Sequence, residues 1–220
     1  MRGPQKPRKE PRQARSRFLV ETIVEAAARV FDAHGYDGAN TNQIARIAGV
    51  SVGSVYQYFP NKDALVTALH ERHVRHMLEL IEQVDEATSG ASLRAATERI
   101  VARSLELHRA EPRLAQLLHA ELPTLEQRRA LSAASQAVFD RTRRLLSSHR
   151  PEIVQPDLEL ATYVVLRMFE ELVHAAALDP PPGVDDDALR RAISDAILGY
   201  LTGAATPAQA GTPADPPPVR

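Results

Sequence analysis

One segment, TNQIARIAGVSVGSVYQYFPNK at residues 41–62, constrains the fold more than any other part of the chain. Between Thr41, which can cap a helix, and Gly49, which can end one in the left-handed conformation, apolar residues recur at helical spacing. Ser51 can cap a second helix, which we expect to run to Phe59. Two short helices joined by a glycine-containing turn form a helix-turn-helix unit, whose second helix can enter the major groove of DNA.

The second helix is expected to carry its polar side chains opposite its apolar face. Ser54, Gln57 and Tyr58 are predicted on the open face, with Tyr56 beside them. Tyr56 could instead lie partly in the core, because so short a helix needs several buried positions. Gly53 is unusual, since glycine inside a helix costs about 1 kcal/mol relative to alanine. Its bare backbone could approach a phosphate or base edge, or it could be a helix-start glycine without a role.

This segment resembles the DNA-binding domain of TetR/AcrR-type repressors. The matching pattern is T-x-x-I-A-x-x-A-G-V-S-x-G-S-V-Y-x-Y-F-x-x-K-x-x-L, and it follows a long helix that ends FDAHGYDGAN. The resemblance covers residues 18 to about 70. It implies an all-α fold, in which an N-terminal three-helix helix-turn-helix domain precedes a larger helical domain for effector binding and dimerisation. It also implies a transcriptional regulator and not an enzyme.

Among regulators, the resemblance favours a ligand-responsive repressor that binds a palindromic operator in double-stranded DNA as a homodimer. Activation of transcription remains an alternative, as does a helical interaction protein that does not bind DNA. A protein that no longer binds DNA is expected to have lost the polar residues on the open face of the second helix, whereas those residues are present in this chain.

The resemblance also implies specific DNA contacts. Phosphate contacts fix the register on the duplex, and contacts to base edges read the sequence. The residues implied to bind phosphate are Thr41, Ser51, Tyr56, Tyr58 and Lys62. Those implied to face the bases are Val52, Gly53, Ser54 and Gln57, with Val52 against a thymine methyl group. Asn42 and Gln43 occupy positions that reach either a base or the backbone.

The charge of the chain is unevenly distributed. Residues 1–17 hold seven basic residues and one acidic residue, a net charge of +6, although the whole chain carries −1. Three prolines indicate that this arm is flexible and extended. It could follow phosphates or enter a minor groove, or it could be a solubilising tail. Because the helix-turn-helix domain expected at residues 18–65 is not basic, we expect the arm to supply much of the non-specific DNA affinity.

The rest of the chain is predicted to be a succession of helices. Residues 66–202 are expected to form the effector-binding and dimerisation domain, and the Pro- and Ala-rich residues 203–220 are expected to be disordered. Apolar periodicity and capping residues predict helices over residues 18–34, 62–87, 93–109, 112–120, 124–149, 158–178 and 185–201.

Two late helices indicate self-association. Residues 158–178 are apolar almost all round, and a helix of that kind must be buried on all sides. The resemblance implies that this helix and the last one pack against their mates in a four-helix dimer interface; the alternative is that both are core of a monomer. The expected interface residues are Phe169, Leu172, Val173, Ala176, Leu189, Ile193, Ile197 and Tyr200.

An effector pocket is implied by the resemblance. Polar and aromatic residues on otherwise apolar helices are the candidates for its lining, namely Arg103, His108, His119, Phe139, Tyr163, Arg167 and His174. Arginine and histidine would suit an anionic or hydrogen-bonding apolar ligand. Arg167 could instead pair with Glu170 or Glu171. The three histidines could converge on a pocket or be ordinary half-buried residues.

Other classes of function find little support. The chain has no cysteine, which excludes disulfides and thiolate metal sites. His70, His73 and His76 share one helix, but HERH is not the HExxH zinc pattern, so a solvated or interdomain face is expected. We find no nucleophile elbow or phosphate-binding glycine loop, and no cofactor is expected. No signal-peptide pattern or apolar segment of about 20 residues occurs, so a cytoplasmic protein without a membrane partner is expected.

Overall fold

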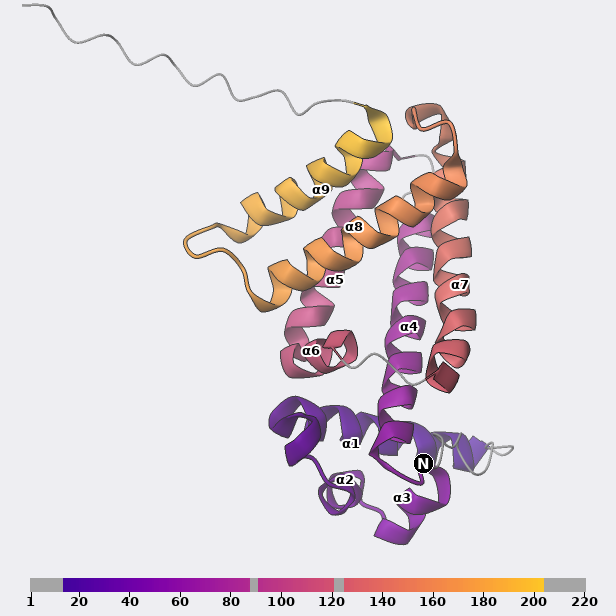
Figure 1. The fold of residues 1–220 in the computed structure, drawn as a ribbon, viewed down its shortest axis with the longest axis vertical. Coiled ribbons are helices and arrows are strands. Elements are labelled where there is room, and N and C mark those ends of the chain that lie inside the picture. Colours follow the sequence, from indigo (N-terminus) through magenta and orange to yellow (C-terminus); the bar gives the residue numbers. More distant parts are fainter. Residues whose placement is uncertain (1–13, 88–90, 121–124, 204–220) are drawn as a thin grey trace, which may run out of the picture.

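The computed structural model describes residues 14–87, 91–120 and 125–203, and these residues form nine α-helices, one 3-10 helix and no strand (Figure 1). The predicted all-α fold is confirmed. Residues 1–13 of the expected arm and residues 204–220 of the expected tail lie outside the described residues. Residues 14–17 form the start of a helix, so the expectation that the arm is flexible and extended as far as residue 17 is wrong. The helices are α1 (Ala14–Gly38), α2 (Thr41–Ala48), α3 (Val52–Tyr58), α4 (Lys62–Ala87), α5 (Leu93–Ala110), α6 (Pro112–Ala120), α7 (Leu125–Ser148), η1 (Arg150–Glu152), α8 (Leu158–Leu178) and α9 (Asp186–Thr202).

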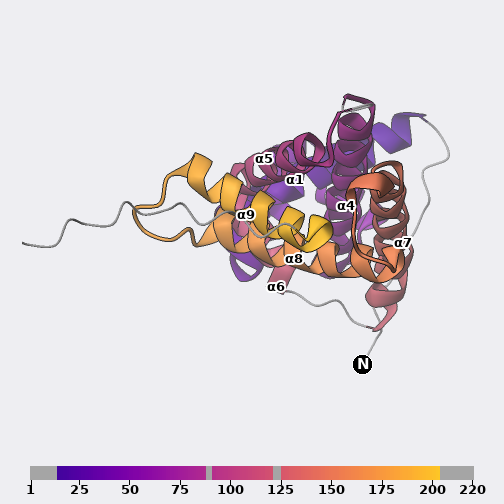
Figure 2. The ribbon, with the colours of Figure 1, turned by 90° about the horizontal axis from the view of Figure 1, so that it is seen from above.

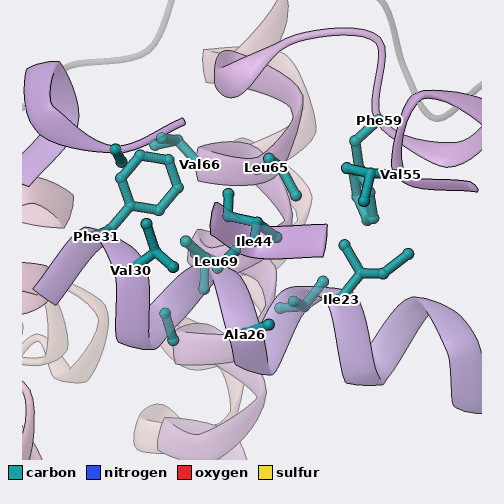
Figure 3. Close-up of a cluster of buried hydrophobic side chains, with 14 of the residues drawn as sticks. Ile23, Ala26, Val30, Phe31, Ile44, Val55, Phe59, Leu65, Val66 and Leu69 are labelled. Carbon is teal, nitrogen blue, oxygen red and sulfur yellow. The ribbon is translucent and has the colours of Figure 1, made fainter. Parts of the chain in front are cut away.

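Helices α1 to α3 and residues 62–69 of α4 form one unit, here called the head. Their apolar side chains converge on a shared core (Figure 3), into which Leu114 and Leu117 of α6 also pack, and its largest fully buried members are Ile23, Val30, Phe31, Ile44, Val55, Phe59, Leu65 and Leu69. Burial of each such side chain contributes about 1.5–3 kcal/mol. Because all four helices supply this core, it fixes the angle at which α3 is presented.

The capping residues of α2 and α3 set the turn between them. Asn40 caps α2: its Oδ1 accepts from the backbone N–H of Gln43 at 3.0 Å, and Gln43 Oε1 accepts from the Asn40 N–H at 3.1 Å. The predicted cap at Thr41 is therefore wrong by one residue. Gly49 ends α2 with a φ of 68°, as predicted. Ser51 caps α3 by accepting from the Ser54 N–H at 3.1 Å, also as predicted.

The remaining helices form the body, which consists of α5 to α9 and the rest of α4. Helix α4 rises unbroken from the head and packs along α7, while α5 packs against α8 and α9 (Figure 1). Helices α8 and α9 lie side by side on one outer side of the molecule (Figure 2). Within the described residues, no helix combines the length and the apolar character that a bilayer crossing requires.

Four residues of the expected dimer interface lie in the core of the chain itself. Val173, Ala176, Ile193 and Ile197 are each at most 4% exposed and pack in the α5–α8–α9 core. Their assignment to the interface is wrong, because a side chain covered within one chain has no surface to offer another. Of the other expected interface residues, Leu172 is exposed, whereas Phe169, Leu189 and Tyr200 are half-buried.

Candidate nucleic-acid interface

Helix α3 lies at the end of the head farthest from the body, with one side open (Figure 1). Gly53, Tyr56 and Gln57 are exposed there, and the Tyr56 side chain is 46% exposed. Val52 and Ser54 are partly buried at the edge of this surface. The open side therefore carries an amide, a phenol and a bare stretch of backbone, with no charge in its centre.

Hydroxyl pairs hold the polar groups of this surface in place. Thr41 Oγ1 and Tyr56 Oη lie 3.1 Å apart and link the start of α2 to α3. Ser51 Oγ and Ser54 Oγ lie 2.8 Å apart in the first turn of α3. A hydroxyl is both donor and acceptor, so each member of a pair can hydrogen bond to its neighbour and still serve a phosphate oxygen. These groups are ordered before any ligand arrives.

Tyr58 does not lie on the open face. It is 5% exposed and packs in the head core, so its predicted placement is wrong. Val55, Tyr58 and Phe59 follow the i, i+3, i+4 pattern of one buried stripe. Tyr58 was expected on the open face because it is four residues from Ser54, but it is also three residues from Val55, which lies in the buried stripe. Tyr56, for which a partly buried position had been the alternative, is instead the exposed tyrosine of α3.

Nothing in the described part of the chain requires glycine at position 53. A Cβ built on Gly53 would meet only Ser51 Oγ, at 3.8 Å, which is ordinary van der Waals contact. Its backbone does not have the positive φ that favours glycine, in contrast to Gly49. The fold therefore does not explain the glycine, which leaves the two expectations, a close approach on the open side of α3 or no role.

Lys62 and Gln43, two further expected DNA contacts, also make bonds within the protein. Lys62 Nζ donates to the backbone carbonyl of Tyr36 at 2.7 Å and lies 4.3 Å from the centre of the Tyr36 ring. The Gln43 side chain takes part in the cap of α2, while Asn42 beside it is exposed. Lys62 and Gln43 would have to share or exchange these bonds to reach DNA.

The head is tied to the body by polar contacts that the sequence did not indicate. Asp32 Oδ1 of α1 accepts from the backbone N–H groups of Arg113 and Leu114 at 2.9 and 3.1 Å, and so caps α6. Arg72 of α4 is 13% exposed and pairs with Glu25 at 2.8 Å and Glu111 at 2.6 Å. Together these contacts form the seam between head and body.

The body encloses a narrow apolar cavity of about 70 Å³. Helices α4, α5, α7, α8 and α9 line it, and the only polar lining residues are Thr97 and Thr142. The Thr97 hydroxyl already donates to the backbone carbonyl of Leu93 at 2.9 Å. The main apolar residues that line the cavity are Met77, Ile81, Ile100, Val138, Leu145, Val165, Leu166 and Phe169.

The residues expected to line an effector pocket lie elsewhere. Arg103, Tyr163 and Arg167 are exposed. Arg167 pairs with Glu170 at 2.8 Å, as the alternative allowed. Phe139 is half-buried beside the lining residue Val138 but does not line the cavity. The three expected histidines, His108, His119 and His174, come together outside the cavity, in a cluster with His73.

Two family models match this chain. The model described as "Bacterial regulatory proteins, tetR family" matches residues 23–69, which include the helix-turn-helix. The model described as "Tetracyclin repressor-like, C-terminal domain" matches residues 92–201, and thus most of the body.

Curated relatives align over shorter stretches. The A-factor receptor protein of Streptomyces griseus is 41% identical over 58 residues, which are 26% of this chain and 21% of the relative. The HTH-type transcriptional repressor DrrR1 of Streptomyces coeruleorubidus is 28% identical over 110 residues, which are 50% of this chain and 39% of the relative. The chain thus spans less than half the length of these curated relatives.

Solved structures share the fold over nearly their whole length. The fatty acid degradation regulator FadR from Bacillus halodurans has a TM-score of 0.67 at 23% identity, covering 87% of this chain and 97% of the other. FadR from Bacillus subtilis, solved in complex with stearoyl-CoA, has a TM-score of 0.66 at 22% identity, covering 83% and 99%. At these identities the likeness shows the fold alone.

Proposed function

Since the chain belongs to the TetR family of transcriptional regulators, we propose that it is a repressor that binds a palindromic operator as a dimer and is released by an apolar effector. Membership makes the chain a regulator and not an enzyme. The observation that carries the proposal is the open side of α3, where ordered hydroxyls and an exposed amide surround a bare stretch of backbone. Action on chromosomal DNA would place the protein in the cytoplasm.

In the proposed complex, the open side of α3 enters the major groove. Gln57 can bond bidentately to an adenine, and Ser54 can serve either a donor or an acceptor on a base edge. The Thr41–Tyr56 hydroxyl pair and Ser51 would hold phosphates on either side of α3 and fix its register. Tyr58 has at most a peripheral part in this interface, because its ring is buried.

The proposed dimer uses the outer side of α8. Leu160 and Tyr163, three residues apart on one side of α8, are 57% and 58% exposed, whereas Leu172 lies about 180° round the helix from Tyr163 and is not part of this side. Exposed large apolar side chains on one helix are costly for a monomer in water and typical of an interface. A twofold dimer presents two heads to two half-sites, which is why a palindrome is expected.

The proposed effector enters the apolar cavity of the body. No charged side chain lines that cavity, so we propose a ligand whose buried part is hydrocarbon, in place of the anionic or hydrogen-bonding apolar ligand that the arginines and histidines had suggested. The stearoyl-CoA bound by the similar FadR supports this class. Met77 and Ile81 of α4 line the cavity, so widening it would move the helix that carries the head. Effector and DNA must then weaken each other by the same factor.

Repression is proposed over activation because the relative DrrR1 is named a repressor. Transcription from a promoter that contains the selected operator, measured in vitro with and without the protein, distinguishes the two.

Selection of bound sites from random DNA duplexes tests the DNA-binding proposal. Wild type should enrich a palindrome, and Gln57→Ala should lose preference at one position of each half-site, at a cost of about 1–3 kcal/mol for that base. Gln83→Ala changes an exposed glutamine on α4, far from α3, and serves as the matched control. Absence of any enriched site in wild type, or equal preferences in wild type and Gln57→Ala, would contradict the assignment.

A further inference from the structure

Four imidazoles from four different helices are in contact, with His73, His108 and His174 half-buried and His119 exposed. The rings of His73 (α4) and His108 (α5) meet edge to face with centroids 5.3 Å apart. His108 meets His174 (α8) at 6.4 Å in the same manner, and His174 stacks on His119 (α6) at 3.7 Å. We call these four residues the imidazole cluster.

The cluster lies where the helices that hold the head meet the helices of the body. Helix α4 continues into the head, and α6 is capped at its start by Asp32 of the head. His73 and His119 therefore sit on the two helices that are fixed to the head. His108 and His174 sit on α5 and α8, which pack in the body core with α9. Separation of these pairs would move the head relative to the body.

Packing in the cluster favours the neutral form of three of its imidazoles, because the pKa values of His73, His108 and His174 are lowered. Burial, followed by the neighbouring charge of His108, lowers the pKa of His73 from 6.5 to about 3. Burial is also the largest cause that lowers the pKa values of His108 and His174. His108 Nδ1 lies 2.7 Å from the backbone carbonyl of Ser104, so it carries the proton of the neutral ring and Nε2 is the atom that would take up another.

Charged groups on the surrounding helices do not reverse this preference. On α4, the neighbours of His73 include Arg72, His70 and His76, each of which disfavours a further positive charge. The pKa of His70 is itself lowered by burial.

Carboxylates oppose these effects but are partly committed to other partners. Glu170 favours protonation of His108 and pairs with Arg167, and Glu171 favours protonation of His174. Glu111, close to His73 and His108, pairs with Arg72. The effects of Glu170 on His108 and of Glu171 on His174 are smaller than that of burial.

The geometry of the cluster suits protons better than a metal ion. Ligands of one ion direct their ring nitrogens at a common point in the ring planes, with metal–nitrogen distances of about 2.0–2.1 Å. The stacked rings of His119 and His174 are only 20° from parallel, so their nitrogens point past each other. Among the described residues, no three histidine or carboxylate side chains are placed to hold one ion.

We propose that the imidazole cluster is a proton-operated switch, in which protonation separates α4 and α6 from α5 and α8 and so repositions the head. The switch is a second input, independent of the apolar cavity. It concerns the position of the head, so it can hold whether or not the proposed operator binding does.

Linkage fixes the direction and the size of the effect. Imidazoles that are apart and hydrated titrate near 6.5, so above that pH both arrangements are neutral and protons favour neither. Below it, each site that is protonated only in the separated arrangement shifts the equilibrium toward separation by up to about tenfold per pH unit. Two such sites shift it by up to about 100-fold between pH 6.5 and 5.5.

Distances between a label on the head and one on the body test the proposal without DNA. The chain has no cysteine, so Asp37→Cys on α1 and Ser147→Cys on α7 give two unique attachment sites for spin labels, both at exposed positions. Pulsed electron–electron double resonance on the full chain at pH 7.5, 6.5 and 5.5, with EDTA present, should show a second label-to-label distance whose population increases as the pH falls. Circular dichroism at each pH should show that the helices are retained.

Variants identify the groups responsible. His108→Gln and His174→Gln should each reduce the shift between pH 6.5 and 5.5 by up to about tenfold, because each removes a site whose pKa is lowered in the packed arrangement. His34→Gln changes an exposed histidine of the head that is outside the cluster, and should leave the shift intact. A single unchanged distance down to pH 5.5, a shift equal in all three variants, or loss of helix before any change of distance would overturn the proposal.

Discussion

Replacement of Gly53 by alanine should have opposite effects on folding and on DNA binding. The new Cβ would meet only Ser51 Oγ, at 3.8 Å, and the backbone is not in the left-handed region. The folded chain can therefore accept the methyl group without strain. Alanine at a compatible helical position stabilises a protein by about 0.4–1 kcal/mol. Gly53 is the second residue of α3, so we expect the lower half of that range.

The same methyl group should weaken the complex with DNA. If the bare backbone of Gly53 contacts a phosphate or base edge, the methyl group must push the two surfaces apart. Overpacking of a close contact costs about 1–3 kcal/mol, which corresponds to a loss of affinity of roughly 5- to 150-fold. Thermal unfolding would follow stability, with about 2–4 °C expected per kcal/mol in a chain of this size. Titration of a fluorescent duplex that carries the selected site would follow affinity.

Gly49→Ala provides the contrast. Gly49 has a φ of 68°, where a side chain costs about 1–2 kcal/mol, so this variant should lose stability. Unchanged affinity of Gly53→Ala would show that α3 does not approach DNA at that position. Reduced stability of Gly53→Ala would refute the inference that the space around it is open.

Two further changes probe the seam and the dimer. Arg72→Leu leaves the Glu111 and Glu25 carboxylates without their partner and should lower the free energy of unfolding in urea by about 1–3 kcal/mol, whereas Arg75→Leu at an exposed site on the same helix should change it by less than about 0.5 kcal/mol. Equal losses of unfolding free energy in Arg72→Leu and Arg75→Leu would show that the ion pairs of the seam do not stabilise the chain. Tyr163→Glu on the exposed side of α8 should convert a dimer to a monomer in sedimentation, and Val154→Glu, also exposed but outside α8, should not; a monomeric wild type would remove the proposed interface.

The helices could be predicted because their ends carry strong local signals. Asn61, Pro112 and Asp157 mark the starts of α4, α6 and α8, and all three helices have the predicted bounds. Helix α1 was predicted to end at Gly35, where the chain has a positive φ, although helical structure continues to Gly38. The cap at Asn40 was also readable, since Asn40 and Gln43 have the spacing of a capping box.

Side-chain placement was less predictable where two faces of a helix compete. Tyr58 is four residues from Ser54 and three from Val55, so spacing alone allowed either face, and the demand for core volume decided it. Helix α8 is apolar on both faces, so its periodicity could not separate the side that meets α5 and α9 from the side left open. The imidazole cluster combines residues up to 101 positions apart and exists only through tertiary packing.

If an effector or protonation moves α4 as proposed, the order of contacts along α4 determines how that movement reaches α3. Leu65 and Leu69 belong to the head core, Arg72 to the seam, His73 to the imidazole cluster, and Ile81 to the cavity. From residue 65 to residue 81 an unbroken helix rises about 24 Å, so displacement at the cavity is carried to the head. The head core is close-packed and cannot absorb it. The Arg72–Glu111 pair joins α4 to the end of α5 and can exchange partners with water, so it should yield first, and the head should move as a rigid body together with α4 and α6, with α3 fixed in it.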